Sequence, residues 1–148
     1  MSGIYTNCFD LWLGKTAAAH TRPDMDTDTI KVGIVDTGTD YVTPSLTANQ
    51  DWADTGYGLD VCYSGEATQT LGAITITAGV VDNTADITFT GVAIVGAQTV
   101  DAIVHYRSGG TAATDALITI HDAFVGGAVT PNGGDIVIAY HASGIFSL

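Results

Sequence analysis

Short runs of β-branched and other apolar residues, separated by glycine-rich turns, recur along the 148 residues of this chain. From residue 70 onward, roughly one run appears every ten to fifteen residues, and no amphipathic segment of crossover length separates them. This spacing predicts mostly antiparallel pairing, because parallel strands need long crossover connections. The expected fold is all-β, an antiparallel β-sandwich or barrel-like domain with one short N-terminal helix.

The expected strands lie between turn signals such as Gly-Gly, Asp-Asn and Pro-Asn-Gly-Gly. The first covers Thr29–Asp36, where Ile30, Val32 and Ile34 alternate onto one face. The others are Ile74–Thr77, Asp86–Thr90, Val92–Val95, Thr99–Arg107, Ala116–Ala123, Asp135–His141 and Ile145–Leu148. No linker divides the chain, so residues 1–148 are expected to form one domain.

Residues 1–16 depart from the strand pattern, because their apolar side chains recur at helical spacing. The members of this stripe are Ile4, Cys8, Leu11 and Trp12. We expect a short helix here, with Ser2 as a candidate N-cap and Gly14 as a candidate end.

Residues 37–60 form the longest stretch without a strand pattern and are rich in Thr, Asp and Gly. Tyr41, Trp52 and Tyr57 are interspersed in it. Long loops in compact domains are uncommon and often functional, so a protruding loop with a contact role is expected.

The strong excess of acidic over basic residues limits which kinds of partner this chain can bind. Lys and Arg total 4 against 16 Asp and Glu, which gives a net charge of −12. Such a surface repels phosphates, so no nucleic-acid partner is expected. It suits either simple solubility or a basic or mixed protein partner. No apolar run approaches the roughly 18–20 residues of a membrane helix, so no membrane partner is expected either.

Cys8 and Cys62 are the only cysteines, and they form no CxxC pair. A metal or redox motif is therefore not indicated. Buried free thiols are the expected state, and a disulfide between the two stays open.

Asp24, Asp26 and Asp28 have the D-x-D-x-D spacing with which a calcium loop of the EF-hand type begins. The pattern then fails, because Thr29 stands where the loop needs Gly and Val35 where it needs Glu. An acidic, solvated lead-in to the first strand is the favoured interpretation, and no cofactor is expected.

Asp36-Thr37-Gly38 matches the tripeptide of aspartic proteases, in which paired carboxylates activate water. A single copy would require a homodimer. Ile94-Val95-Gly96 echoes the later hydrophobic-hydrophobic-Gly element of these enzymes. The Arg-Asn or Arg-Asp pair that usually follows this element is absent, since Ala97-Gln98 stands there. A strand that ends in Asp-Thr-Gly is also ordinary turn chemistry, so a protease is the less favoured alternative and no enzyme is expected.

His105, His121 and His141 lie in three different expected strands, and His20 lies outside them. Three imidazoles from neighbouring strands are able to bind zinc. No HxH or HExxH spacing brings two of them together locally, so structural or surface histidines are favoured and no metal is expected.

Three segments taken together resemble a family of tailed-phage structural proteins encoded among head and tail genes. They are DTIKVGIVDTGTDYV (Asp28–Val42), VDAIVHYRSGGTAATDALITIHD (Val100–Asp122) and VTPNGGDIVIAYHASGIFSL (Val129–Leu148). The likeness extends over roughly residues 4–148, and the ordered set is more specific than any single piece. The acidic stretch before Asp28 and the longer segment after Asp36 depart from the family pattern.

The resemblance implies a noncatalytic virion protein, made in the host bacterial cytoplasm and placed on the outer capsid surface. Similar proteins look like capsid decoration (cement) proteins, so the implied partner is the major capsid protein. Self-association is implied too, and a trimer would suit a local three-fold axis. A tail, neck or fibre-associated virion protein is the alternative. The candidate capsid or subunit contacts are the N-terminal Ile4, Tyr5, Phe9 and Trp12 and the loop residues Tyr41, Trp52 and Tyr57. For the N-terminal set, the favoured alternative is that its helix merely covers one end of the sandwich.

Overall fold

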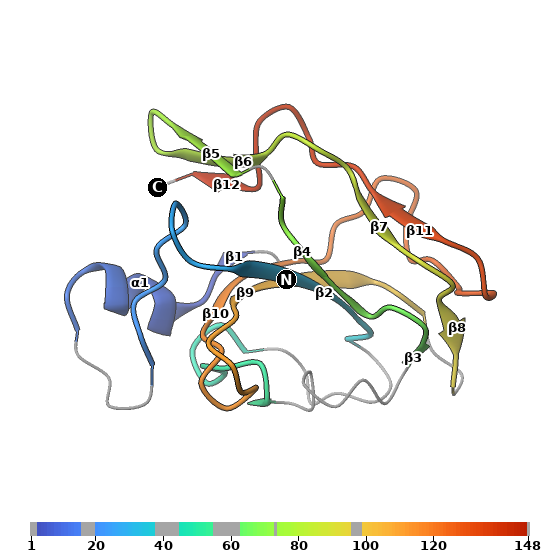
Figure 1. The fold of residues 1–148 in the computed structure, drawn as a ribbon, viewed down its shortest axis with the longest axis horizontal. Helices are drawn as coiled ribbons and strands as arrows, with labels where there is room; N and C mark the ends of the chain where they lie inside the picture. Colours follow the sequence, from blue (N-terminus) through green and yellow to red (C-terminus); the bar gives the residue numbers. More distant parts are fainter. Residues whose placement is uncertain are drawn as a thin grey trace.

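The protein is all-β, with two packed layers of antiparallel strands and one short helix, in a computed structural model that describes residues 3–15, 20–37, 45–54, 63–72, 74–95 and 99–147 (Figure 1). Every strand pair among these residues is antiparallel. This confirms the fold class predicted from the spacing of the β-branched runs.

The larger layer is a five-stranded sheet with the order β1-β10-β9-β2-β4. Its strands are β1 (Gly3–Ile4), β2 (Ile30–Val35), β4 (Thr68–Thr70), β9 (Ala102–Arg107) and β10 (Leu117–His121). Strands β9 and β10 form a hairpin at the centre, and β2 pairs with β9 over six residues. The sheet is therefore built around contacts between segments far apart in the chain.

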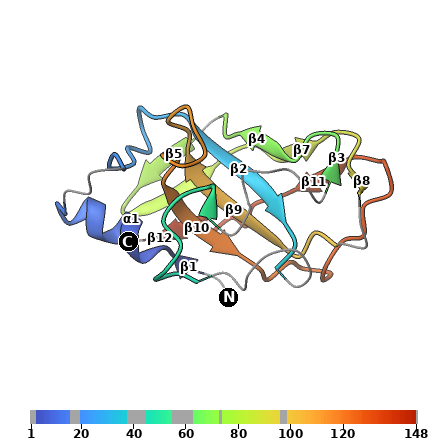
Figure 2. The same cartoon turned by 90° about the horizontal axis from the view of Figure 1, so that it is seen from below.

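The second layer consists of small sheets that lie over one face of the larger sheet (Figure 1). One contains β5 (Ile74–Thr77), β6 (Val80–Asn83) and β12 (Phe146–Ser147). Another pairs β7 (Ile87–Phe89) with β11 (Ile136–Ile138), and β3 (Tyr63–Ser64) pairs with β8 (Ala93–Ile94) at the far end of the molecule (Figure 2).

The core lies between the two layers because the register turns alternate side chains of the central strands toward the small sheets. Ile30, Val32 and Ile34 share a face with His105 and Ile103, their neighbours on β9. All five are buried, together with Phe89 of β7 and Val81 of β6. The single face predicted for Ile30, Val32 and Ile34 is confirmed.

The opposite face of the large sheet is covered by the segment 45–54. Trp52 stacks on Tyr106 with ring centroids 4.3 Å apart, and its indole lies over Gly33 of β2. Backbone hydrogen bonds from Trp52 N to Asp115 O and from Leu117 N to Gln50 O hold this segment against the start of β10. The prediction of a protruding loop is therefore wrong for residues 45–54, because they bury an indole and pair with the sheet. Residues 38–44 and 55–60 lie outside the described part of the chain.

Gly33 is required by this packing. A Cβ added there would lie 2.2 Å from Cη2 of Trp52, and the stacked indole has little room to move. We expect Gly33→Ala to lower the free energy of unfolding by about 1–3 kcal/mol, the usual cost of overpacking a core. Chemical denaturation measures it, with Gly72→Ala as a control, since no atom lies within 4 Å of a Cβ there. Equal stabilities for the two variants would contradict the packing.

The helix α1 (Thr6–Trp12) confirms the expectation of one short helix near the N-terminus, but it is shorter than residues 1–16. Ile4 belongs to β1, where it pairs with Thr119 of β10. The expected N-cap Ser2 lies outside the described residues. Gly14 follows the helix with φ of +95°, so the predicted end is nearly right. In the residues described, no helix is long and apolar enough to span a bilayer.

Candidate functional site

The N-terminal contact residues expected from the sequence divide into buried and exposed side chains. Tyr5 is fully buried, so its assignment as a surface contact is wrong: it stabilises the fold from within. Trp12 is half-buried, and its Nε1 donates a hydrogen bond of 2.8 Å to the carbonyl of Pro23. Its ring also stacks on Phe146 of β12, which fixes α1 to the second layer. Ile4 is half-buried, and only Phe9 is largely exposed, at 46%.

The loop residues expected as contacts do not supply a surface patch in the described part of the chain. Trp52 is 6% exposed and belongs to the core, so a contact role for it is also wrong. From the sequence alone, an aromatic residue in a polar loop is equally compatible with an interface and with the core. Trp52 belongs to the core because its ring packs against Tyr106 and Gly33. Tyr41 and Tyr57 lie outside the described residues.

Leu13 directly follows α1, four residues after Phe9, and is 74% exposed. Side chains four apart lie on the same side of a helix, so Phe9 and Leu13 form one apolar surface, the α1 patch. Leu13 falls outside the apolar stripe predicted from the sequence, because that stripe is aligned on Ile4 and Cys8, which pack against the core. At the other end of the long axis lie β8 and β11 (Figure 1). Val95, which follows β8, and Val137 in β11 are 65% and 57% exposed. They belong to two different small sheets at this end, and the two separate apolar side chains are named here the β8–β11 patch.

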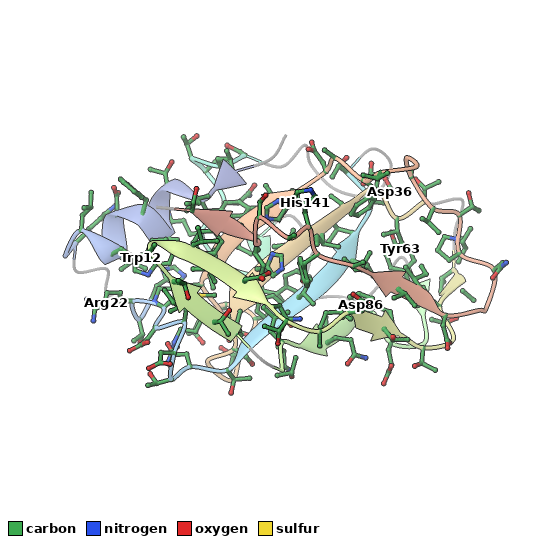
Figure 3. All side chains as sticks on the ribbon, turned by 90° about the horizontal axis from the view of Figure 1, so that it is seen from above. Trp12, Arg22, Asp36, Tyr63, Asp86 and His141 are labelled. Carbon is green, nitrogen blue, oxygen red and sulfur yellow. The ribbon has the colours of Figure 1, made fainter. Side chains whose placement is uncertain are left out.

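Asp36, the first residue of the Asp-Thr-Gly tripeptide, is 2% exposed, and its Oδ2 accepts a hydrogen bond of 3.0 Å from the Thr99 amide. Beside it, the amide and hydroxyl of Thr37 donate to the two carboxylate oxygens of Asp101. These bonds tie the end of β2 to the segment before β9. The geometry favours a structural use of the carboxylate, and Gly38 lies outside the described residues. In Figure 3, Asp36 lies toward the end opposite Trp12 and Arg22.

The D-x-D-x-D segment folds into a turn closed by its own carboxylates. Oδ1 of Asp24 accepts from the Asp26 amide, and Oδ2 of Asp28 accepts from the Asp24 amide. Arg107 Nε donates to Asp28 Oδ2 at 2.7 Å. Partial burial alone would raise the pKa of Asp28, but the hydrogen bond and charge of Arg107 and the Asp24 amide outweigh it and hold the pKa below its ordinary value. The carboxylates of Asp24 and Asp28 are thus committed to the turn, and that of Asp28 also to Arg107.

The histidines form a polar cluster inside the apolar core. The His105 ring, fully buried, contacts the hydroxyl of Thr119 through Nδ1 at 2.9 Å and that of Tyr140 through Nε2 at 2.8 Å. His121 packs edge-on against it, with ring centroids 5.5 Å apart. Desolvation by burial, reinforced by nearby His121, lowers the pKa of His105 to about 3. His105 is therefore neutral at pH 7 and connects the central sheet to the second layer.

His20 and His141 lie apart from this cluster and have other hydrogen-bond partners, so they do not complete a metal site with it. His20 Nε2 lies 3.3 Å from Asp51 Oδ2, and His141 Nδ1 contacts the Ser143 hydroxyl. Within the described ranges, no group of three or more His, Cys, Asp or Glu side chains is arranged to hold a metal ion. Cys8 carries a free, buried thiol whose pKa burial raises to about 12, and Cys62 lies outside the described residues.

A cavity of about 430 Å³ lies between the central sheet and the C-terminal segment. It is lined from the sheet by Ile103 and His121, and from the second layer by Ile136, Ile138 and Ile145. Phe124 and Val125, in the loop that follows β10, border it on a third side. No local sequence signal points to this cavity, because its walls come from three separate stretches of chain.

No family model, curated protein or solved structure matches this chain.

Proposed function

We propose that this chain is a noncatalytic structural protein of a tailed-phage virion, and specifically a decoration protein that binds the outer head shell. In this proposal it contacts neighbouring capsid subunits and stabilises their junctions. Its partners are then the major capsid protein and other copies of itself, and a trimer would suit a local three-fold axis.

The single observation that carries the proposal is the presence of exposed apolar surfaces at both ends of the long axis. The α1 patch of Phe9 and Leu13 lies at one end, and the β8–β11 patch of Val95 and Val137 lies at the other (Figure 1). A protein that joins two neighbours needs two separate contact surfaces. Each contact can be weak, because many copies bind the same lattice together.

The use of the polar core residues supports a noncatalytic role. Asp36 is buried and accepts a backbone hydrogen bond, and both ring nitrogens of His105 contact hydroxyl groups. A general base or nucleophile needs access to its substrate, and these groups instead hold strands together. The same bonds stiffen the domain, and a rigid domain binds a preformed lattice with less loss of entropy.

The three segments that resemble phage structural proteins contribute the centre of the fold. Asp28–Val42 contains β2, Val100–Asp122 contains the β9–β10 hairpin, and Val129–Leu148 contains β11 and β12. The likeness therefore falls on the framework strands. The exposed residues Leu13 and Val95 lie outside these segments, whereas Val137 lies within the third, so the contact surfaces are proposed from exposure and not from the likeness.

The charge of −12 gives the proposal an electrostatic requirement. Copies of this chain repel one another at long range, so the apolar patches and the shell must overcome that repulsion. A basic or mixed surface on the partner would attract the chain and speed its binding, and raised salt would weaken this attraction.

Replacing Leu13 by aspartate is expected to weaken binding to decoration-free particles of the encoding phage by about tenfold or more, since the charge would lose water at the contact. Val137→Asp is expected to do the same from the other end. Thr75→Asp adds the same charge at an exposed position of β5 and serves as the matched control. Bound protein per particle is measured by sedimentation and quantitative gel analysis. Equal binding by all three variants would contradict the proposed surfaces.

A further inference from the structure

The cavity beside β11 has the composition of a small-molecule site. Its volume of about 430 Å³ falls within the roughly 300–1,000 Å³ of typical ligand pockets. Most of its described lining is aliphatic or aromatic, and none of the lining residues described is Asp, Glu, Lys or Arg. The chain has 20 charged residues, most of them acidic, so an uncharged pocket lining is a distinct feature of this molecule.

Three residues that line the cavity carry polar side chains, and they differ in whether those side chains have hydrogen-bond partners. Tyr140 gives its hydroxyl to the contact with His105 Nε2, and His141 Nδ1 is occupied by Ser143. His121 differs, because its Nε2 is buried and has no hydrogen-bond partner in the described part of the chain. A buried nitrogen without a partner lowers stability, and a ligand that satisfies it recovers that loss.

We propose that this cavity binds a small, uncharged molecule with an apolar body and one hydrogen-bonding group, such as a hydroxyl, directed at Nε2 of His121. A carboxylate is disfavoured, because no cation lines the described wall and burial lowers the pKa of His121, which keeps the ring neutral. The cavity shares Val137 with the β8–β11 patch, but phenol binding to the isolated chain is measured without particles and does not depend on the proposed role in the virion.

Titration of the full chain with phenol, benzene and benzoate, followed by methyl and imidazole NMR signals, tests the proposal. Phenol is expected to shift the methyl signals of Ile103, Ile136 and Ile145 saturably, together with the ring signals of His121. Benzene lacks the hydroxyl and is expected to bind about tenfold more weakly. Benzoate has a similar body and a charge, and is expected to bind at least about a hundredfold more weakly. No saturable shift with phenol, or equal binding of phenol and benzoate, would overturn the proposal.

Two substitutions locate the site. Ala123→Phe places a ring at the lining and is expected to abolish phenol binding, whereas Ala128→Phe, in the same loop but outside the lining, is expected to leave it unchanged. His121→Leu is expected to remove the difference between phenol and benzene while keeping benzene binding. Unchanged phenol binding in Ala123→Phe would overturn the assignment to this cavity, even if His121→Leu fails to fold.

Discussion

Trp52→Ala is expected to lower the free energy of unfolding by about 3–5 kcal/mol, the usual cost of removing a large buried aromatic side chain. The indole is 6% exposed, stacks on Tyr106 and fills the space above Gly33. Its removal would open a cavity on the face of the sheet that segment 45–54 covers, and Tyr106 would lose its stacking partner. This is a large fraction of the stability of a typical single domain.

Urea denaturation followed by circular dichroism measures this loss. Phe9→Ala is the matched control, because Phe9 is an exposed aromatic residue and its truncation is expected to change the stability by less than about 0.5 kcal/mol. The two substitutions thereby separate a core residue from a contact residue. If Trp52→Ala left the stability intact and impaired only particle binding, the indole would be a surface contact and its described packing would be wrong.

Acidification from pH 7 to pH 3 is expected to remove roughly 4 kcal/mol of stability through His105 alone. Burial lowers the pKa of His105 in the folded state to about 3, whereas an unfolded histidine titrates near its ordinary value of 6.5. Between these two values the unfolded chain binds a proton that the folded chain excludes. The contribution is therefore fully present above pH 6.5 and is lost progressively as the pH falls toward 3.

The free energy of unfolding at several pH values between 3 and 7, for wild type and His105→Gln, isolates this effect. Glutamine does not titrate, so the variant is expected to show a shallower loss of stability on acidification, although it is less stable at pH 7. Carboxylates such as Asp28, whose pKa is lowered, also lose stabilising contacts as the pH falls, but they do so equally in both proteins. Parallel pH profiles would show that His105 is not the buried neutral group described.

The framework of the fold follows from the sequence, because runs of β-branched and other apolar residues between turn signals mark the central strands, which are buried on both faces. Strands β2, β9 and β10 fall within the predicted ranges, and their antiparallel pairing follows from the missing crossovers. The strands β1, β3, β4 and β6 were not predicted. They span two to four residues each, too few for a period to be visible, and the Asp82-Asn83 turn signal masked the end of β6.

The candidate site was less predictable, since its residues come together only through tertiary pairing. His105 and Thr119 become neighbours because β9 and β10 pair in one particular register, with an irregularity between Leu117 and Thr119. Tyr140 reaches the same ring from a segment 35 positions away in the chain. The exposure of aromatic residues could not be predicted either. Phe9 and Trp52 are both aromatic residues in polar surroundings in the sequence, and only tertiary packing makes the first exposed and the second buried.

A map of the native virion by electron cryo-microscopy at side-chain resolution tests the central claim most directly. The account predicts density for this chain on the outer head shell at junctions between capsid subunits, with the α1 patch and the β8–β11 patch against different neighbours. Density at the neck or tail alone would favour the alternative virion role and contradict the decoration function. Absence of the chain from the particle would contradict the proposal as a whole, and Asp36→Asn in a protease assay would then become the next experiment.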